Sequence, residues 1–127
     1  MNPEGAPKRT RLHRWALAAA ALPPLVSLAL VVSFATHMHK SLGGWPEVIG
    51  MHGFPRGLRI HAEVALSVFG AVFVGFLFVM PLGIFLCSCV EKWRPGLRYL
   101  GIFAAVSLLA FGAMQLAPRP FLVWWWD

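Results

Sequence analysis

The sequence predicts an all-α integral membrane protein whose three transmembrane helices form an up-down-up bundle with a half-buried outer loop. Three long segments carry no formally charged side chain: Trp15 to Met38, Val64 to Val90, and Tyr99 to Pro118. A helix needs about 20 apolar residues to cross the bilayer's hydrocarbon core. Because backbone amides find no water in lipid, each segment is expected to cross as a helix. Charged residues make up only 13% of the chain, against about a quarter in soluble domains, which supports this class.

One membrane domain is expected, because the longest segment outside the spans is too short to build its own core. Its parts are a disordered basic tail (1–13), span one (15–38), an outer loop (39–60), span two (61–90), a cytoplasmic turn (91–97), span three (98–117) and an outer Trp-rich tail (118–127). A cleaved signal peptide is the alternative for the first segment. Its apolar stretch exceeds the roughly 7–15 residues of a signal h-region, which favours an uncleaved span.

The net charge of +6 predicts an orientation rather than a nucleic-acid partner. Seven Lys and Arg residues precede span one or join spans two and three, and four lie in the outer loop and the tail. The positive-inside rule therefore places the N-terminus in the cytoplasm and the C-terminus outside. The expected location is a bacterial inner membrane or its equivalent.

Small residues predict where the spans pack. Ser67, Ala71 and Gly75 recur every four residues in span two, and Gly101 and Ala105 repeat that spacing in span three. Such stripes let helix backbones approach closely in lipid. We expect the small faces of spans two and three to meet, although the same faces could instead contact a partner protein.

Prolines predict two bends in the spans. Pro23 and Pro24 interrupt span one, and Pro81 with Gly83 lies near the cytoplasmic end of span two. Proline removes an amide donor and clashes with the preceding turn, so a kink is expected at each place. Broken helices also occur in transport pathways, which makes a small transporter or channel subunit a second alternative function.

The outer side carries the only group of residues whose side chains could together bind a metal or a cofactor. Its members are four histidines and one carboxylate: His37, His39, His52, His61 and Glu63. Histidines with a carboxylate suit transition metals, and a bis-histidine haem between spans one and two is conceivable. No spacing here is diagnostic of a metal site, so we interpret the histidines as interfacial residues. Glu63 is expected to point inward and to pair with a basic residue or a histidine.

Tryptophans are expected at the membrane–water interfaces, where indole is favoured. They are Trp15, Trp93, Trp124, Trp125 and Trp126. The last three are consecutive, so their side chains point in three directions and cannot all pack into one small bundle. Membrane anchoring is the expected role, and docking to a partner protein is the alternative.

No nucleophile elbow, phosphate loop, dinucleotide fingerprint or pair of catalytic carboxylates is present. We therefore expect no enzymatic activity and no resident cofactor. The sequence favours a structural or accessory membrane protein, bound to the bilayer and to itself or a larger membrane complex. A redox or metal-binding anchor that uses the outer histidines is the first alternative.

Overall fold

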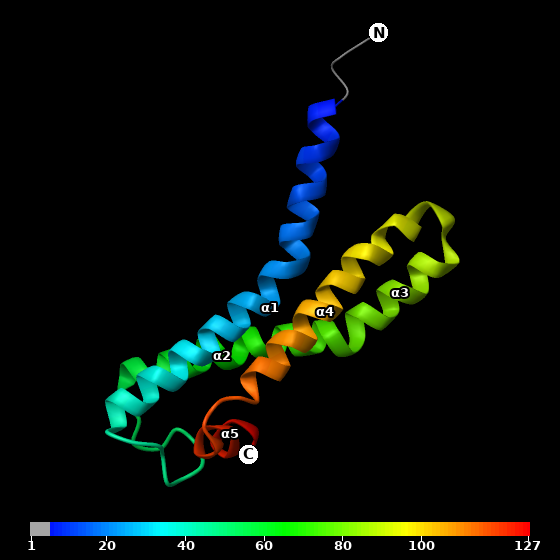
Figure 1. Ribbon diagram of the computed structural model, residues 1–127. Coiled ribbons are helices and arrows are strands. Elements are labelled where there is room, and N and C mark those ends of the chain that lie inside the picture. Colours follow the sequence, from blue (N-terminus) through cyan, green and yellow to red (C-terminus); the bar gives the residue numbers. More distant parts are fainter. Residues whose placement is uncertain (1–5) are drawn as a thin grey trace.

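The computed structural model describes the backbone of residues 6–127 and the side chains from residue 13 onward, and all its regular structure is helical. The helices are α1 (Ala6–Leu42), α2 (Arg56–Val74), the π-helical turn η2 (Gly75–Val79), α3 (Met80–Cys89), the 3-10 helix η3 (Glu91–Gly96), α4 (Leu97–Met114) and α5 (Arg119–Trp126). Since α2, η2 and α3 follow one another directly, three long helical segments alternate in direction (Figure 1).

The three spans predicted from the sequence correspond to these segments. His13–Leu42, Arg56–Cys89 and Glu91–Met114 are each long and apolar enough to cross a membrane. Each apolar segment belongs to a helix that also includes flanking polar residues, because charged side chains near a helix end can extend into the headgroup region.

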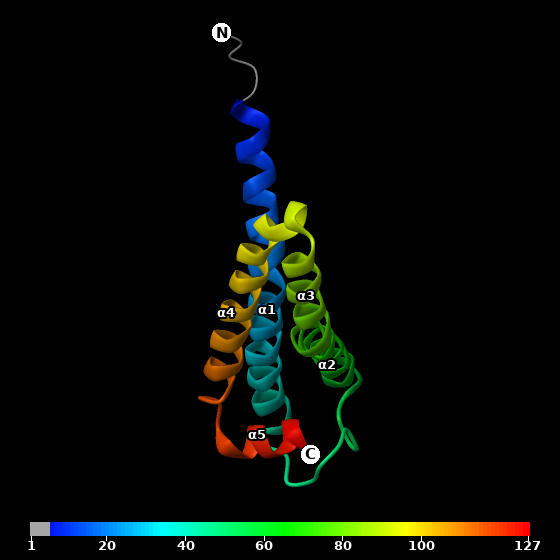
Figure 2. The same cartoon turned by 90° about the vertical axis from the view of Figure 1, so that its right-hand side faces the viewer.

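Helix α1 is the centre of the bundle and packs against both α2 and α4 (Figure 2). Its buried residues alternate between spacings of four and three: Ala20, Pro24, Ser27, Val31, Phe34 and Met38. The buried residues of α2 follow the same rule: Leu58, Ala62, Ala65, Phe69 and Val72. This is the spacing of a coiled-coil interface, in which helices cross at about 20°. We call these two sets the packing seams of α1 and α2.

The small faces of spans two and three do not meet, contrary to the expectation from the sequence, because the packing seams use other residues. Ser67 and Ala71 are exposed on α2, and Gly101 and Ala105 are exposed on α4. Gly75 is half-buried, and a Cβ placed there would lie 3.6 Å from the Phe103 ring of α4. Within one chain, α1 occupies the space between the two helices, so these small faces have no contact with each other.

The predicted bends are present, but the second one lies earlier than expected. Helix α1 changes direction in its first half, where Pro23 and Pro24 lie inside it (Figure 1). In span two the irregular turn is η2, which precedes Pro81. There the amide of Met80 bonds to the carbonyl of Gly75, five residues back instead of four. Such π-bulges are a recognised cause of helix bending.

The N-terminal tail differs from its prediction. Residues 1–5 lie outside the described residues, but α1 already begins at Ala6, inside the segment expected to be disordered. Lys, Arg, Leu and Ala are good helix formers, and they dominate the sequence between this point and the apolar span. The helix therefore extends beyond the apolar segment.

The outer loop is half-buried, as its composition predicted. Helix α1 ends at Leu42, and the next residue, Gly43, has a φ of +69°, the left-handed conformation of a glycine helix cap. Farther on, Phe54 is buried and Trp45 packs partly against the core, whereas Val48 stays exposed. The loop thus covers one end of the bundle together with α5 (Figure 2).

Candidate functional site

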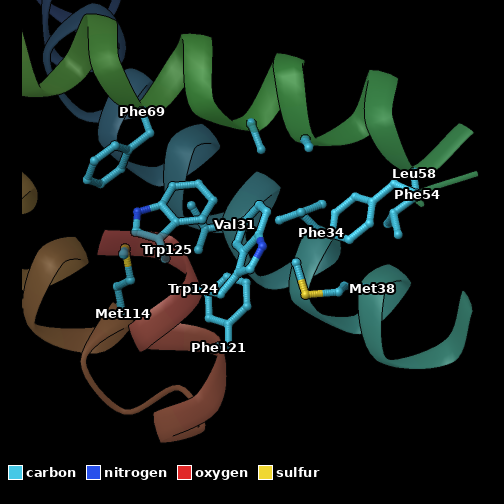
Figure 3. Close-up of a cluster of buried hydrophobic side chains, with 12 residues drawn as sticks. Val31, Phe34, Met38, Phe54, Leu58, Phe69, Met114, Phe121, Trp124 and Trp125 are labelled. Atoms are coloured by element: carbon cyan, nitrogen blue, oxygen red, sulfur yellow. The ribbon is translucent and has the colours of Figure 1, made fainter. Parts of the chain in front are cut away.

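An aromatic cluster closes the outer end of the bundle, where α1, α2 and the outer loop meet α5 (Figure 3). Helix α5 follows Pro118 and folds back under the bundle. Phe121, Trp124 and Trp125 are spaced i, i+3 and i+4 and share one helix face. All three are buried against Phe34 of α1, which lies 5.4–6.2 Å from each ring between centroids. We call these residues, with Phe54 and Phe69, the outer aromatic cluster.

Trp124 connects this cluster to the outer loop. Its indole ring stacks on Phe54 with centroids 5.6 Å apart, and its Nε1–H donates to the carbonyl of Gly50 at 3.1 Å. Gly50 has a φ of +97°, a conformation that favours glycine. A buried indole N–H costs free energy unless it has a partner, and this bond supplies one. The hydrogen bond therefore also fixes the path of the loop.

The expectation that Trp124 and Trp125 anchor the chain in the membrane is wrong. Trp124 and Trp125 are 7% exposed and belong to the protein core, so they cannot anchor the chain in the headgroup region. Trp126 is 53% exposed, and the expectation that three consecutive indoles cannot all pack inside is confirmed. Trp15 and Trp93 are also exposed, which leaves their predicted anchoring role available.

The candidate histidine site contains one pair rather than four converging ligands. His37 of α1 and His61 of α2 face each other with their Nδ1 atoms 3.0 Å apart and their ring centroids 5.2 Å apart. One ring must donate and the other accept, so the bond requires a lone pair on one Nδ1 atom. The pair lies beside Phe34, whose ring meets His61 edge-on at 5.6 Å. It joins the outer ends of two spans.

The other predicted members lie elsewhere. His39 packs edge-on against Trp45 with centroids 4.8 Å apart, and His52 is exposed in the outer loop. Glu63 is exposed on α2, so the expectation that it points into the bundle is wrong. Among the described residues, no group of three or more His, Cys, Asp or Glu side chains is placed to hold a metal ion.

A haem does not fit between the facing Nδ1 atoms of His37 and His61. Two nitrogens on opposite sides of one metal ion stand about 4 Å apart, since each bond is about 2 Å long. These two atoms lie 3.0 Å apart and already share a hydrogen bond. A metal held by the pair alone would lack the further protein ligands that structural sites use. What the arrangement does chemically is to join α1 and α2 through a partly buried hydrogen bond.

Replacing His37 with phenylalanine is expected to lower the free energy of unfolding by about 1–3 kcal/mol, because His61 loses its partner in a partly buried place. His61→Phe should cost a similar amount, and the double variant less than the sum of both, which a double-mutant cycle in mild detergent measures. His52→Phe is the control and should be neutral. A stoichiometric metal or haem in the native protein, lost in the double variant, would contradict this structural role.

Sequence reasoning missed a third histidine contact at the opposite end. His13 Nδ1 and the hydroxyl of Tyr99 lie 2.8 Å apart and connect the start of α1 to α4. Tyr99 is the only tyrosine in the chain, and it stands where the last span begins. A polar aromatic at a span boundary is an interfacial signal, but only the bend of α1 determines which residue it meets.

Comparison with known proteins adds no assignment: no protein-family model, curated protein or solved structure matches the chain. The class of protein is therefore defined by the fold alone, as an all-helical chain with three segments able to span a membrane.

Proposed function

We propose that the chain is a non-catalytic structural or accessory subunit of a membrane assembly, formed with copies of itself or with a larger complex. The observation that carries this proposal is the exposure of Ser67 and Ala71 on α2 and of Gly101 and Ala105 on α4. Since α1 separates these faces within one chain, they are free to meet another helix. Small side chains allow the close approach that drives helix association in lipid.

The outer residues support a structural subunit over a redox anchor. His37 and His61 bond to each other, and Trp124 and Trp125 of α5 pack in the core. Glu63 is exposed on α2 and does not face the bundle interior, where an ionisable residue would support a transport pathway. Of the candidate site residues, His37, His61 and His39 make contacts within the fold, while His52 and Glu63 are exposed and do not converge on a site.

The proposal includes an orientation, with the start of α1 and η3 in the cytoplasm and the outer loop with α5 outside. The seven-to-four division of Lys and Arg residues supports it through the positive-inside rule. The proposed membrane is a bacterial inner membrane or its equivalent.

Ala71→Leu tests the assembly. Native mass spectrometry from mild detergent is expected to detect complexes of more than one polypeptide, and Ala71→Leu should weaken them about fivefold to tenfold, the equivalent of roughly 1 kcal/mol. Val74→Leu is the matched control, because Val74 is also exposed on α2 but is already bulky. A native protein that is monomeric under these conditions, or equal effects of both variants, would overturn the proposal.

A further inference from the structure

An open apolar groove of about 580 Å³ lies between α1, η2–α3 and α4, at the end of the bundle opposite the outer aromatic cluster. Its shape follows from the bend in α1, whose first half diverges from the α3–α4 hairpin (Figure 1). Small residues make up half of its lining: Ala16, Ala19, Ala20, Gly75, Gly83 and Gly96. Alanine and glycine keep the groove hollow, because larger side chains on either wall would fill it.

The groove has the length of a lipid chain in one leaflet. Along span two it runs from Cys87 to Gly75. At about 1.5 Å per residue this distance is roughly 18 Å. The hydrocarbon part of one leaflet is about 15 Å deep, half of the bilayer core.

Polar and basic residues lie at the end of the bundle where the groove begins. His13 of α1 and the groove residue Tyr99 form their 2.8 Å hydrogen bond there, and the guanidinium carbon of Arg98 lies 5.0 Å from the Tyr99 ring centroid. Arg14 and Arg94, each two positions before a groove residue, are exposed at the same end. The lining itself has no charged residue, so these three arginines lie beside the groove, at the level of the bundle where an anionic headgroup would be.

We propose that this groove binds one anionic phospholipid, with an acyl chain along the apolar walls and the phosphate-bearing headgroup among Arg14, Arg94 and Arg98. Charge complementarity favours an anionic headgroup, and anionic lipids are concentrated in the cytoplasmic leaflet, where the proposed orientation places this end of the groove. A helix from a second protein is about 10 Å wide and would enter a groove of this volume with only part of its width, whereas the length of the groove matches one acyl chain.

A second groove provides a comparison. It has a volume of about 490 Å³, lies between the outer half of α1 and the end of α4, and has Lys40 in its lining. Arg119 directly follows its lining residue Pro118. Lipid chains can lie against both grooves, but three arginines stand at the end of the bundle where the first one lies, against two basic residues near the second.

The test counts lipids retained by the purified full chain. Native mass spectrometry in mild detergent is carried out after addition of phosphatidylglycerol or of phosphatidylcholine with the same acyl chains. One phosphatidylglycerol per chain is expected to remain bound. The double variant Ala16→Leu/Ala19→Leu fills the groove and should lose it, while Ala18→Leu/Ala21→Leu, on the same helix but outside the groove lining, should retain it.

Charge variants test the headgroup separately. Removing one arginine near an anionic headgroup is expected to weaken binding about fivefold, so Arg14→Gln/Arg98→Gln should lower phosphatidylglycerol retention about 20-fold or more. Arg119→Gln at the outer end is the control. Equal retention of both lipids, or unchanged retention in the filled groove, would overturn the proposal. So would loss of a protein partner, rather than of lipid, in the filled variant.

Discussion

Replacing Trp124 with alanine is expected to lower the free energy of unfolding by about 3–5 kcal/mol, the range typical of a buried aromatic truncated to alanine. The indole is 7% exposed, contacts Phe34 and Phe54, and donates to Gly50. Its removal leaves a cavity and also releases the outer loop from α5. Denaturant unfolding in mild detergent, followed by circular dichroism, measures the change.

Trp126 provides a control on the same short helix. It lies two positions further along and is 53% exposed, with an edge contact to Phe69 at 5.8 Å between ring centroids. Trp126→Ala should therefore lower the unfolding free energy by only about 0.5–1.5 kcal/mol. The two variants remove the same side chain, but only that of Trp124 is buried and hydrogen-bonded to the loop. Equal losses of stability would show that α5 does not pack as described and would return all three tryptophans to the role of membrane anchors.

A further variant of Trp124 separates the contribution of packing to stability from that of the hydrogen bond. Trp124→Phe keeps most of the aromatic volume but cannot donate to the Gly50 carbonyl. We expect it to cost about 1–2 kcal/mol, less than alanine, because the lost bond adds to a smaller cavity. Proteolysis within the outer loop should increase in this variant as well, since the bond holds the loop against the bundle.

The spans could be predicted from the sequence because the bilayer imposes a strong and simple requirement. A run without charges and about 20 residues long has few alternatives to a membrane helix. Span ends were less predictable: α1 continues to Leu42, beyond the last residue of its apolar run. Polar residues such as Lys40 can stay in a helix at the interface, so polarity does not mark where the helix ends.

The packing faces could not be predicted by the same means. Inside a span nearly every residue is apolar, so hydrophobic periodicity does not separate a buried face from a lipid-facing one. Ala71 in the four-residue stripe and Ala65 in the packing seam are chemically identical, yet the first is exposed and the second is fully buried. The seam of α2 follows the alternating spacing of four and three. Other sets of apolar residues on the same helix have this spacing too, so the sequence does not show which set is buried.

The candidate site was predictable only in outline. The sequence assigns His37 and His61 to the same side of the membrane, near the end of span one and the start of span two, and the structure brings them within hydrogen-bond distance. That they face each other depends on the rotation of α1 against α2, which the seam determines. The burial of Trp124 and Trp125 depends on the chain folding back after Pro118. Pro118 and Pro120 signal that the span ends here, but not the direction that the chain then takes.

A substitution in the packing seams is expected to cause the second large loss of stability. Ala65→Leu is expected to destabilise the chain by about 1–3 kcal/mol, because Ala65 is fully buried in the α2 seam and extra methyl groups push α2 away from α1. The displacement would also strain the hydrogen bond between His37 and His61, one turn away, so the measured cost should fall in the upper part of that range.

Ala71→Leu is the matched control for this prediction, with the same substitution on the exposed face of the same helix. Thermal unfolding of the monomer in detergent should respond to Ala65→Leu and not to Ala71→Leu, whereas the assembly measured by native mass spectrometry should respond to Ala71→Leu. If Ala71→Leu destabilises the monomer as much as Ala65→Leu does, the four-residue stripe packs within the chain after all. The two alanines therefore separate the interface that folds the chain from the one proposed to assemble it, since a bulky residue damages only the contact in which it lies.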